Sequence, residues 1–198
     1  MRYTRPLAFL ACALLALCTA SCAPFFGEPM PSPAPQVKSI EAFQRDIEPA
    51  IVAARNELVT ADTFRSYKNK DFIDRYVKEG AYVYSLHSRL YFVWDVDTDH
   101  IRETYNKHLL PLGFEVSEES WISNGIKLVS FTWTNEQYHA VVSATSRIGD
   151  ESGDQTGTQY YTQENPSDDS TSDPQRLIDL PGRIPDWFDP NLPPAGQG

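Results

Sequence analysis

Residues 125–146 read GIKLVSFTWTNEQYHAVVSATS and contain two runs in which apolar and polar side chains alternate. Alternation with a period of two is typical of β-strands that bury one face, and the polar pair Asn135 and Glu136 between the runs indicates a turn. The stretch therefore predicts an antiparallel hairpin. Phe131 and Trp133 share one face of its first strand, which we expect to pack against helices. The alternative is an open aromatic row that stacks on sugar rings or holds a peptide.

The segment before this hairpin changes from a strand pattern to a helix pattern. Residues 81–96 are dense in aromatic and branched side chains, which favours one long strand or a hairpin bent at His87 and Ser88. A helix over about 98–110 follows, with an aspartate or threonine cap at its start and Gly113 as its stop. The chain then re-enters the sheet at about residue 114.

A further helix is expected where the domain begins. After Ser39, a good capping residue, apolar side chains recur at three- and four-residue steps over residues 40–58. Pro49 lies off the apolar face and predicts a kink or a division into two helices. Residues 60–70 show no clear period, whereas residues 72–77 predict a short helical turn, with Gly80 as its stop.

This order of elements predicts an α+β fold, namely a two-layer domain with an antiparallel sheet packed by two or three helices and with disordered termini. We place the domain at residues 39–148. Residues 149–198 are acidic and too poor in branched apolar side chains to fold alone, which predicts a mostly disordered tail. The Trp187 and Phe188 pair either docks on the domain, stays disordered or is a peptide that another protein recognises, and we favour the first two.

The N-terminus has the layout of an export signal. Arg2 and Arg5 precede eleven apolar residues, and small residues follow. Residues 19–22, TASC, resemble the lipobox of bacterial lipoproteins. In that family the cysteine, here Cys22, receives a diacylglyceryl group through its sulfur and becomes the first residue of the mature protein. The resemblance implies a signal peptide over 1–21, lipidation at Cys22 and a lipid-anchored position on the extracytoplasmic side of the cell membrane.

Two alternatives to lipidation are an ordinary signal peptide, in which Cys22 is a bystander, and a transmembrane anchor. A membrane span needs about 20 apolar residues, whereas this run has eleven, which disfavours a transmembrane anchor. Cys22 is the only cysteine left after cleavage, so the exported chain has no partner for a disulfide. Residues 22–38 contain five prolines and predict an extended stalk that begins at the lipidated cysteine.

The layout beyond Cys22 also carries a resemblance. A proline-rich stalk, one α+β unit and a polar tail, together with the segment from Gly113, Phe114 and Glu115 to the hairpin, resemble small uncharacterised lipoproteins of actinobacteria. This resemblance implies a fold and a location, and it transfers no catalytic residue.

Charge narrows the choice of partners. The formal net charge is −10, and residues 149–198 hold ten acidic side chains against two arginines. The sequence contains no cluster of Lys and Arg, which argues against nucleic acid as a partner. The expected partners are the membrane, through the lipid anchor, and an envelope protein or glycan.

The aspartates of residues 95–100 form a candidate metal-binding motif. Asp95, Asp97 and Asp99 alternate in DVDTDH and are similar to the start of an EF-hand calcium loop. That loop needs glycine at its sixth position and glutamate at its twelfth, where this chain has His100 and Asn106. We therefore favour helix capping by these carboxylates over metal binding.

Other chemical motifs are weaker still. No zinc motif includes any of the four histidines, which are His87, His100, His108 and His139. The sequence has no nucleophile motif and, after lipidation of Cys22, no free thiol. Glu115, Glu118 and Glu119 are acidic residues on an expected loop, where carboxylates are usually solvated.

We therefore expect no catalytic, metal or cofactor site. The leading hypothesis is a membrane-anchored extracytoplasmic lipoprotein that acts as a non-enzymatic binding or interaction module in the cell envelope. The alternative is a cell-wall-directed hydrolase that uses carboxylates such as Asp97, Glu115 or Glu119.

Overall fold

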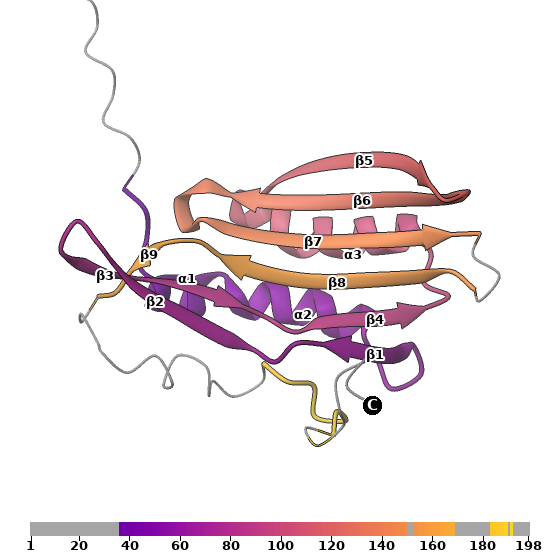
Figure 1. Cartoon of the computed structure of the whole chain (residues 1–198), viewed down its shortest axis with the longest axis horizontal. Coiled ribbons are helices and arrows are strands. Elements are labelled where there is room, and N and C mark those ends of the chain that lie inside the picture. The colour runs from indigo at the N-terminus through magenta and orange to yellow at the C-terminus, as the bar shows by residue number, and fades with distance from the viewer. Residues whose placement is uncertain (1–35, 150–152, 169–182, 190, 192–198) are drawn as a thin grey trace, which may run out of the picture. The chain divides into compact units, whose positions relative to one another are not determined.

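The computed structural model describes residues 36–149, 153–168, 183–189 and 191. These residues form one nine-stranded antiparallel sheet, and three α-helices lie behind it in the view of Figure 1. The signal peptide, Cys22 and most of the stalk lie outside the described residues. The strands are β1 Phe64–Lys68, β2 Phe72–Lys78, β3 Ala81–His87, β4 Leu90–Trp94, β5 Glu115–Ser123, β6 Ile126–Asn135, β7 Ala140–Ile148, β8 Gln155–Thr162 and β9 Asn165–Pro166. The helices are α1 Ile40–Asp46, α2 Glu48–Leu58 and α3 Thr98–Leu109, with 3₁₀ turns η1 Leu110–Leu112 and η2 Glu136–Tyr138.

The main path of the sheet runs in the order β1-β4-β8-β7-β6-β5. A hairpin of β2 and β3 branches from this path, because β3 also pairs with β8 and β9. All of these pairings are antiparallel. The predicted α+β class with an antiparallel sheet is therefore confirmed, and the three α-helices agree with the two or three expected, although the sheet is larger than the sequence indicated.

The predicted hairpin is the best-formed part of the sheet. β6 and β7 pair over nine residues, from Lys127 with Ile148 to Asn135 with Ala140. Asn135 caps the intervening turn, because its side chain accepts a hydrogen bond from the backbone N–H of Tyr138 at 3.3 Å. The hairpin prediction is confirmed, including the position of its turn.

Residues 81–96 contain two strands separated by Ser88 and Arg89. β3 and β4 follow one another along the same side of β8, where His87 pairs with Tyr161 and Tyr91 pairs with Thr158. They do not pair with each other in the described sheet. The alternative of one long strand is therefore closer to the structure than the bent hairpin.

The helices begin and end where the sequence predicted. Ser39 caps α1 by accepting a hydrogen bond from the N–H of Ala42 at 3.1 Å. Pro49 lies in the first turn of α2, where a missing N–H costs nothing, and the predicted division into two helices occurs at Ile47. Gly113 ends the turn after α3 with a φ of 81°, as expected of a glycine stop.

The helical turn predicted over residues 72–77 is wrong, because these residues form β2. The apolar pattern of this short segment fits a helix or a strand equally well, and pairing with β3 over seven residues decides for the strand. Glu79 and Gly80 form the turn between the two strands with φ values of 52° and 83°. Such a two-residue turn requires positive φ, so Gly80 is a hairpin residue and not a helix stop.

The boundary placed at residue 148 is also wrong. Residues 155–162 form β8, which lies between β4 and β7 in the middle of the main path. Their inward side chains are threonines and a tyrosine whose hydroxyls find partners. Ser146 and Thr156 lie 2.7 Å apart, and Tyr105 and Thr158 lie 2.6 Å apart. A strand whose buried side chains are polar resembles a disordered segment in composition, which explains the error.

The core lies between the sheet and the helices and has two clusters. The larger cluster contains Trp133 and Phe131 of β6, together with apolar side chains of all three α-helices. The burial of the Trp133 face is therefore confirmed. The smaller cluster gathers Val59, Tyr67, Tyr91, Val93 and Phe188. Phe188 comes from the C-terminal segment, so this part of the predicted disordered tail docks on the domain.

Candidate functional site: the open face of the sheet

One face of the sheet carries no helix in the part of the chain that the structure describes (Figure 1). Along β6, β7 and β8 the side chains of this face alternate with the buried ones. We call this surface the open face. It includes Trp121 on β5, Leu128, Ser130 and Thr132 on β6, Val141, Ser143, Thr145 and Arg147 on β7, Gln155, Gln159 and Tyr161 on β8, Phe92 and Trp94 on β4, and His87 on β3.

The centre of the open face is polar and uncharged. Cross-strand register places Thr132 beside Ser143, and Ser143 beside Gln159. The hydroxyls of Ser130 and Thr145 lie 2.9 Å apart on the neighbouring row. Hydroxyl and amide groups both donate and accept hydrogen bonds, so this centre matches ligands rich in hydroxyl or amide groups.

Aromatic side chains border this polar centre. The rings of Phe72 and His87 are stacked with centroids 4.5 Å apart, and His87 stacks on Tyr161 at 5.9 Å. These rings, with Gln159 and Gln163, line a pocket with a volume of about 240 Å³. The pocket is therefore a place where a small group meets both aromatic rings and amides.

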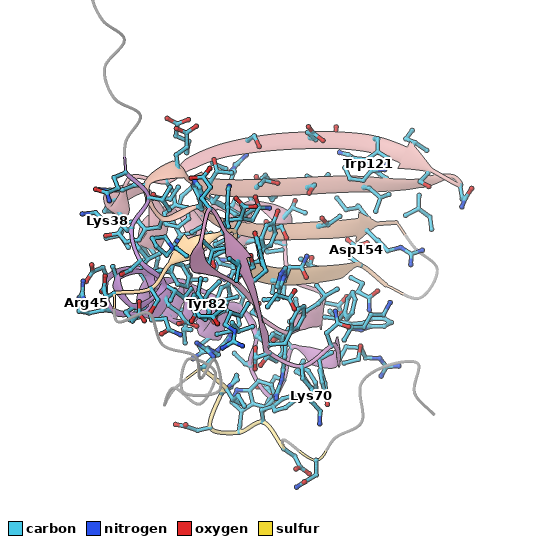
Figure 2. The ribbon with its side chains drawn as sticks, turned by 60° about the vertical axis from the view of Figure 1, so that its left-hand side comes forward. Lys38, Arg45, Lys70, Tyr82, Trp121 and Asp154 are labelled. Carbon is cyan, nitrogen blue, oxygen red and sulfur yellow. The ribbon has the colours of Figure 1, made fainter. Side chains whose placement is uncertain are left out.

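Two further aromatic rings lie against glycines of the neighbouring strand and loop. A Cβ atom at Gly157 would approach the Phe92 ring to 3.1 Å, and one at Gly153 would approach Trp94 to 3.0 Å. Both rings therefore lie close to the backbone. Trp121 at the other border is 43% exposed, and Figure 2 shows it on the strand at the edge of the sheet.

Two of the three alternating aspartates, Asp97 and Asp99, act at the start of α3, as expected. Asp97 caps α3, because one of its oxygens accepts hydrogen bonds from the N–H groups of Asp99 at 2.8 Å and His100 at 3.1 Å. Asp99 forms an ion pair with Arg102 at 2.7 Å. Asp95 has a positive φ of 52° and lines, with Asp97, a pocket of about 390 Å³ at the start of the helix. No group of three or more metal-ligating side chains occurs within the described ranges.

Two of the four histidines, His100 and His108, lie on α3, whereas His87 lies on β3 and His139 follows η2. His108 contacts Glu57 on α2, with 2.6 Å between Nε2 and a carboxylate oxygen. This contact and that of Lys107 lower the pKa of the Glu57 carboxyl. His139 follows the β6–β7 turn and lies 2.8 Å from the carbonyl of Gln163 through Nδ1. His87 belongs to the aromatic stack already described.

The expected loop position of the glutamates is wrong, because Glu115, Glu118 and Glu119 lie on β5. Glu115 and Glu119 share the open face and are four residues apart, which separates them by about 13 Å along a strand. That distance exceeds the separation of roughly 5–9.5 Å between the two carboxyls of a glycosidase. Glu118 points to the other face and pairs with Arg102 at 3.6 Å.

A comparison with family models assigns residues 36–173 to a domain of unknown function, DUF4853. The match covers more than half of the chain. The chain belongs to the DUF4853 family. No curated protein and no solved structure matches it. None of the helices in the described ranges is long and apolar enough to cross a membrane.

Sequence reasoning missed a buried ionic cluster, part of which lies beyond the DUF4853 match. Arg183 donates to Glu48 through Nε at 2.7 Å and Nη2 at 3.1 Å. The hydroxyl of Tyr160 donates to the same carboxylate at 2.5 Å. Burial, and next the charge of Glu48, raise the pKa of Tyr160 well above its usual value. The partners are 135 residues apart in the chain, so no local pattern pointed to them.

Proposed function

We propose that this DUF4853 protein is a lipid-anchored, extracytoplasmic binding module that is not an enzyme and that holds an envelope component on its open face. The observation that carries the proposal is a broad sheet face that no described helix covers and that combines a polar centre with bordering aromatic rings. Lipidation at Cys22 would hold the module at the outer side of the cell membrane, with the stalk over 22–38 between lipid and domain.

The chemistry of the face favours a neutral glycan chain as the ligand. Sugars present apolar ring faces, which pack on aromatic side chains, and hydroxyls, which exchange hydrogen bonds with Ser, Thr and Gln. The charged side chains of the face, such as Glu119 and Arg147, lie outside its central row of Thr132, Ser143 and Gln159. Arg65 and Lys68 lie over Trp94 and Phe92 at the β4 border, so a strongly charged polymer would find no charged side chain along the central row.

Paired substitutions on one strand test the face. Trp121 belongs to the open face, whereas the next residue, Ile122, points to the other face and is 77% exposed. We expect Trp121→Ala to weaken binding to purified envelope glycan about fivefold, because loss of one ring contact costs roughly 1 kcal/mol. Gln159→Ala should weaken binding as well, whereas Ile122→Ala should leave it unchanged. Isothermal titration calorimetry gives the affinities, and equal effects of Trp121→Ala and Ile122→Ala would contradict the assignment.

The anchor is tested separately. Mass spectrometry of the mature protein should find a diacylglyceryl group on Cys22, and the Cys22→Ala variant should leave the membrane fraction. Cys18→Ala is the matched control and should remain lipidated. An exported wild-type chain with a free Cys22 thiol would refute the anchor without bearing on the open face.

A further inference from the structure

The C-terminal segment, residues 183–189, buries Arg183, Pro185 and Phe188 against the domain, and Ile184 packs partly against the smaller cluster. Arg183 and Phe188 are 3% and 5% exposed, whereas Asp186 and Trp187 between them are exposed. Among the described residues this segment joins no strand of the sheet. The backbone N–H of Phe188 donates a hydrogen bond to the carbonyl of Pro185 at 2.9 Å, within the segment itself. Deep anchors separated by exposed residues are typical of a short peptide bound to a receptor surface.

The first anchor position is built for a guanidinium group. Glu48 at the start of α2 is 4% exposed and accepts two hydrogen bonds from Arg183. Arg55 of the same helix donates to the backbone carbonyl of Arg183 at 2.6 Å. Because a buried carboxylate without a cation is strongly unfavourable, this position requires a positively charged occupant.

The second anchor position is built for an aromatic ring. The Phe188 ring meets Tyr67 at 5.2 Å and Phe64 at 5.6 Å between centroids, both edge-on. The Arg89 guanidinium lies 5.1 Å from the centre of the same ring and forms an ion pair with Asp71. Rings and a cation around one side chain select an aromatic residue over an aliphatic one.

Both positions belong to the part of the chain that matches the DUF4853 model, whereas the segment that fills them lies beyond residue 173. Residues 169–182 connect the two and supply fourteen residues of chain. We propose that the surface formed by α2, β1, β4 and β8 is a peptide-binding site that selects an arginine and an aromatic residue five positions later. The chain's own residues 183–189 are its intramolecular and exchangeable ligand.

The test uses the full chain with a protease site inserted into residues 169–182. A labelled peptide of residues 183–189, RIPDWFD, is titrated before and after cleavage, and fluorescence anisotropy reports binding. Before cleavage the attached segment competes at an effective concentration on the order of millimolar, so micromolar peptide should not bind. After cleavage the peptide should exchange with the cut segment and bind at least a hundredfold more tightly than to the uncut chain.

Peptide variants test the two anchors. Arg183→Ala and Phe188→Ala should each weaken binding at least tenfold, whereas Asp186→Ala, at an exposed position, should bind like the original. In a Glu48→Gln chain the preference for arginine over alanine should shrink at least threefold. A cut segment that never exchanges, a cut chain that unfolds, or equal binding of all three peptide variants would overturn the proposal. None of these outcomes bears on the open face or on Cys22.

Discussion

The two faces of the sheet are built from neighbouring residues of the same strands, yet they differ in kind. On β6, Trp133 is fully buried against α3, while Thr132 beside it belongs to the open face. On β8, Tyr160 reaches the buried Glu48, while Gln159 lies among hydroxyls on the other side. Each of these strands therefore places one row of side chains in the core and the other row on the open face, which we propose for recognition.

The helix-side face also contains hydrogen bonds that involve buried side chains. Trp133 donates to Asn106 at 2.8 Å, and Tyr105 lies 2.6 Å from Thr158. Buried polar groups stabilise a fold only while each keeps its partner, so substitutions on this face should be costly. Substitutions on the open face should change binding and leave stability almost unchanged.

The sharpest test of this contrast uses two adjacent residues. Trp133→Ala should lower the free energy of unfolding by about 3–5 kcal/mol, because it removes a large buried ring and leaves a cavity. Thr132→Ala should change it by no more than about 0.5 kcal/mol, as expected at a surface position. Urea denaturation of both variants measures these values. Similar losses in the two variants would show that the open face is part of a second core.

The contrast between the faces also explains what the sequence could predict. Trp133 and its neighbours alternate strictly, so the β6–β7 hairpin and its buried side were predictable from a period of two. Ser39, Pro49 and Gly113 marked helix ends correctly, because capping and proline act within a few residues. These features depend on local chemistry.

Other parts depend on distant partners and were not predictable in this way. β8 buries Thr156 and Thr158, whose hydroxyls are satisfied only by residues of β7 and α3. The Glu48 and Arg183 pair joins the two ends of the domain, and composition alone assigned Arg183 to a disordered tail. The open face was missed as a site because its register across six strands appears only in the folded sheet.

A second prediction concerns alkaline pH and the helix-side face. Burial raises the pKa of Tyr105 to about 12, despite the opposing effect of its hydrogen bond with Thr158. In the unfolded chain a tyrosine ionises near pH 10, so between about pH 10 and 12 the unfolded state binds fewer protons. The contribution of Tyr105 to the free energy of unfolding is therefore fully present below pH 10. It falls by roughly 3 kcal/mol as the pH rises to 12.

The variant Tyr105→Phe isolates this effect. Near pH 7 its free energy of unfolding should be about 1 kcal/mol lower than that of the original protein, because Thr158 loses its hydrogen-bond partner. Above pH 10 its free energy of unfolding should decline less than that of the original protein. Denaturant midpoints between pH 7 and 12 give both values, and phenolate absorbance follows ionisation. A decline of the same size in the variant would assign the alkaline loss to other groups, of which Tyr160 is the first to test.

The smallest expected effect separates the binding module from the hydrolase alternative. Asp97→Ala should lower the free energy of unfolding by about 1 kcal/mol, because the first turn of α3 loses its cap. Asp97→Asn should keep most of this stability, because asparagine also caps helices. Glu119→Gln on the open face should change stability by less than about 0.5 kcal/mol. If Asp97 were instead a catalytic carboxylate, the asparagine variant would keep its stability and lose cleavage of cell-wall material. Thermal unfolding together with an assay of glycan cleavage therefore distinguishes a helix cap from a catalytic acid at one position.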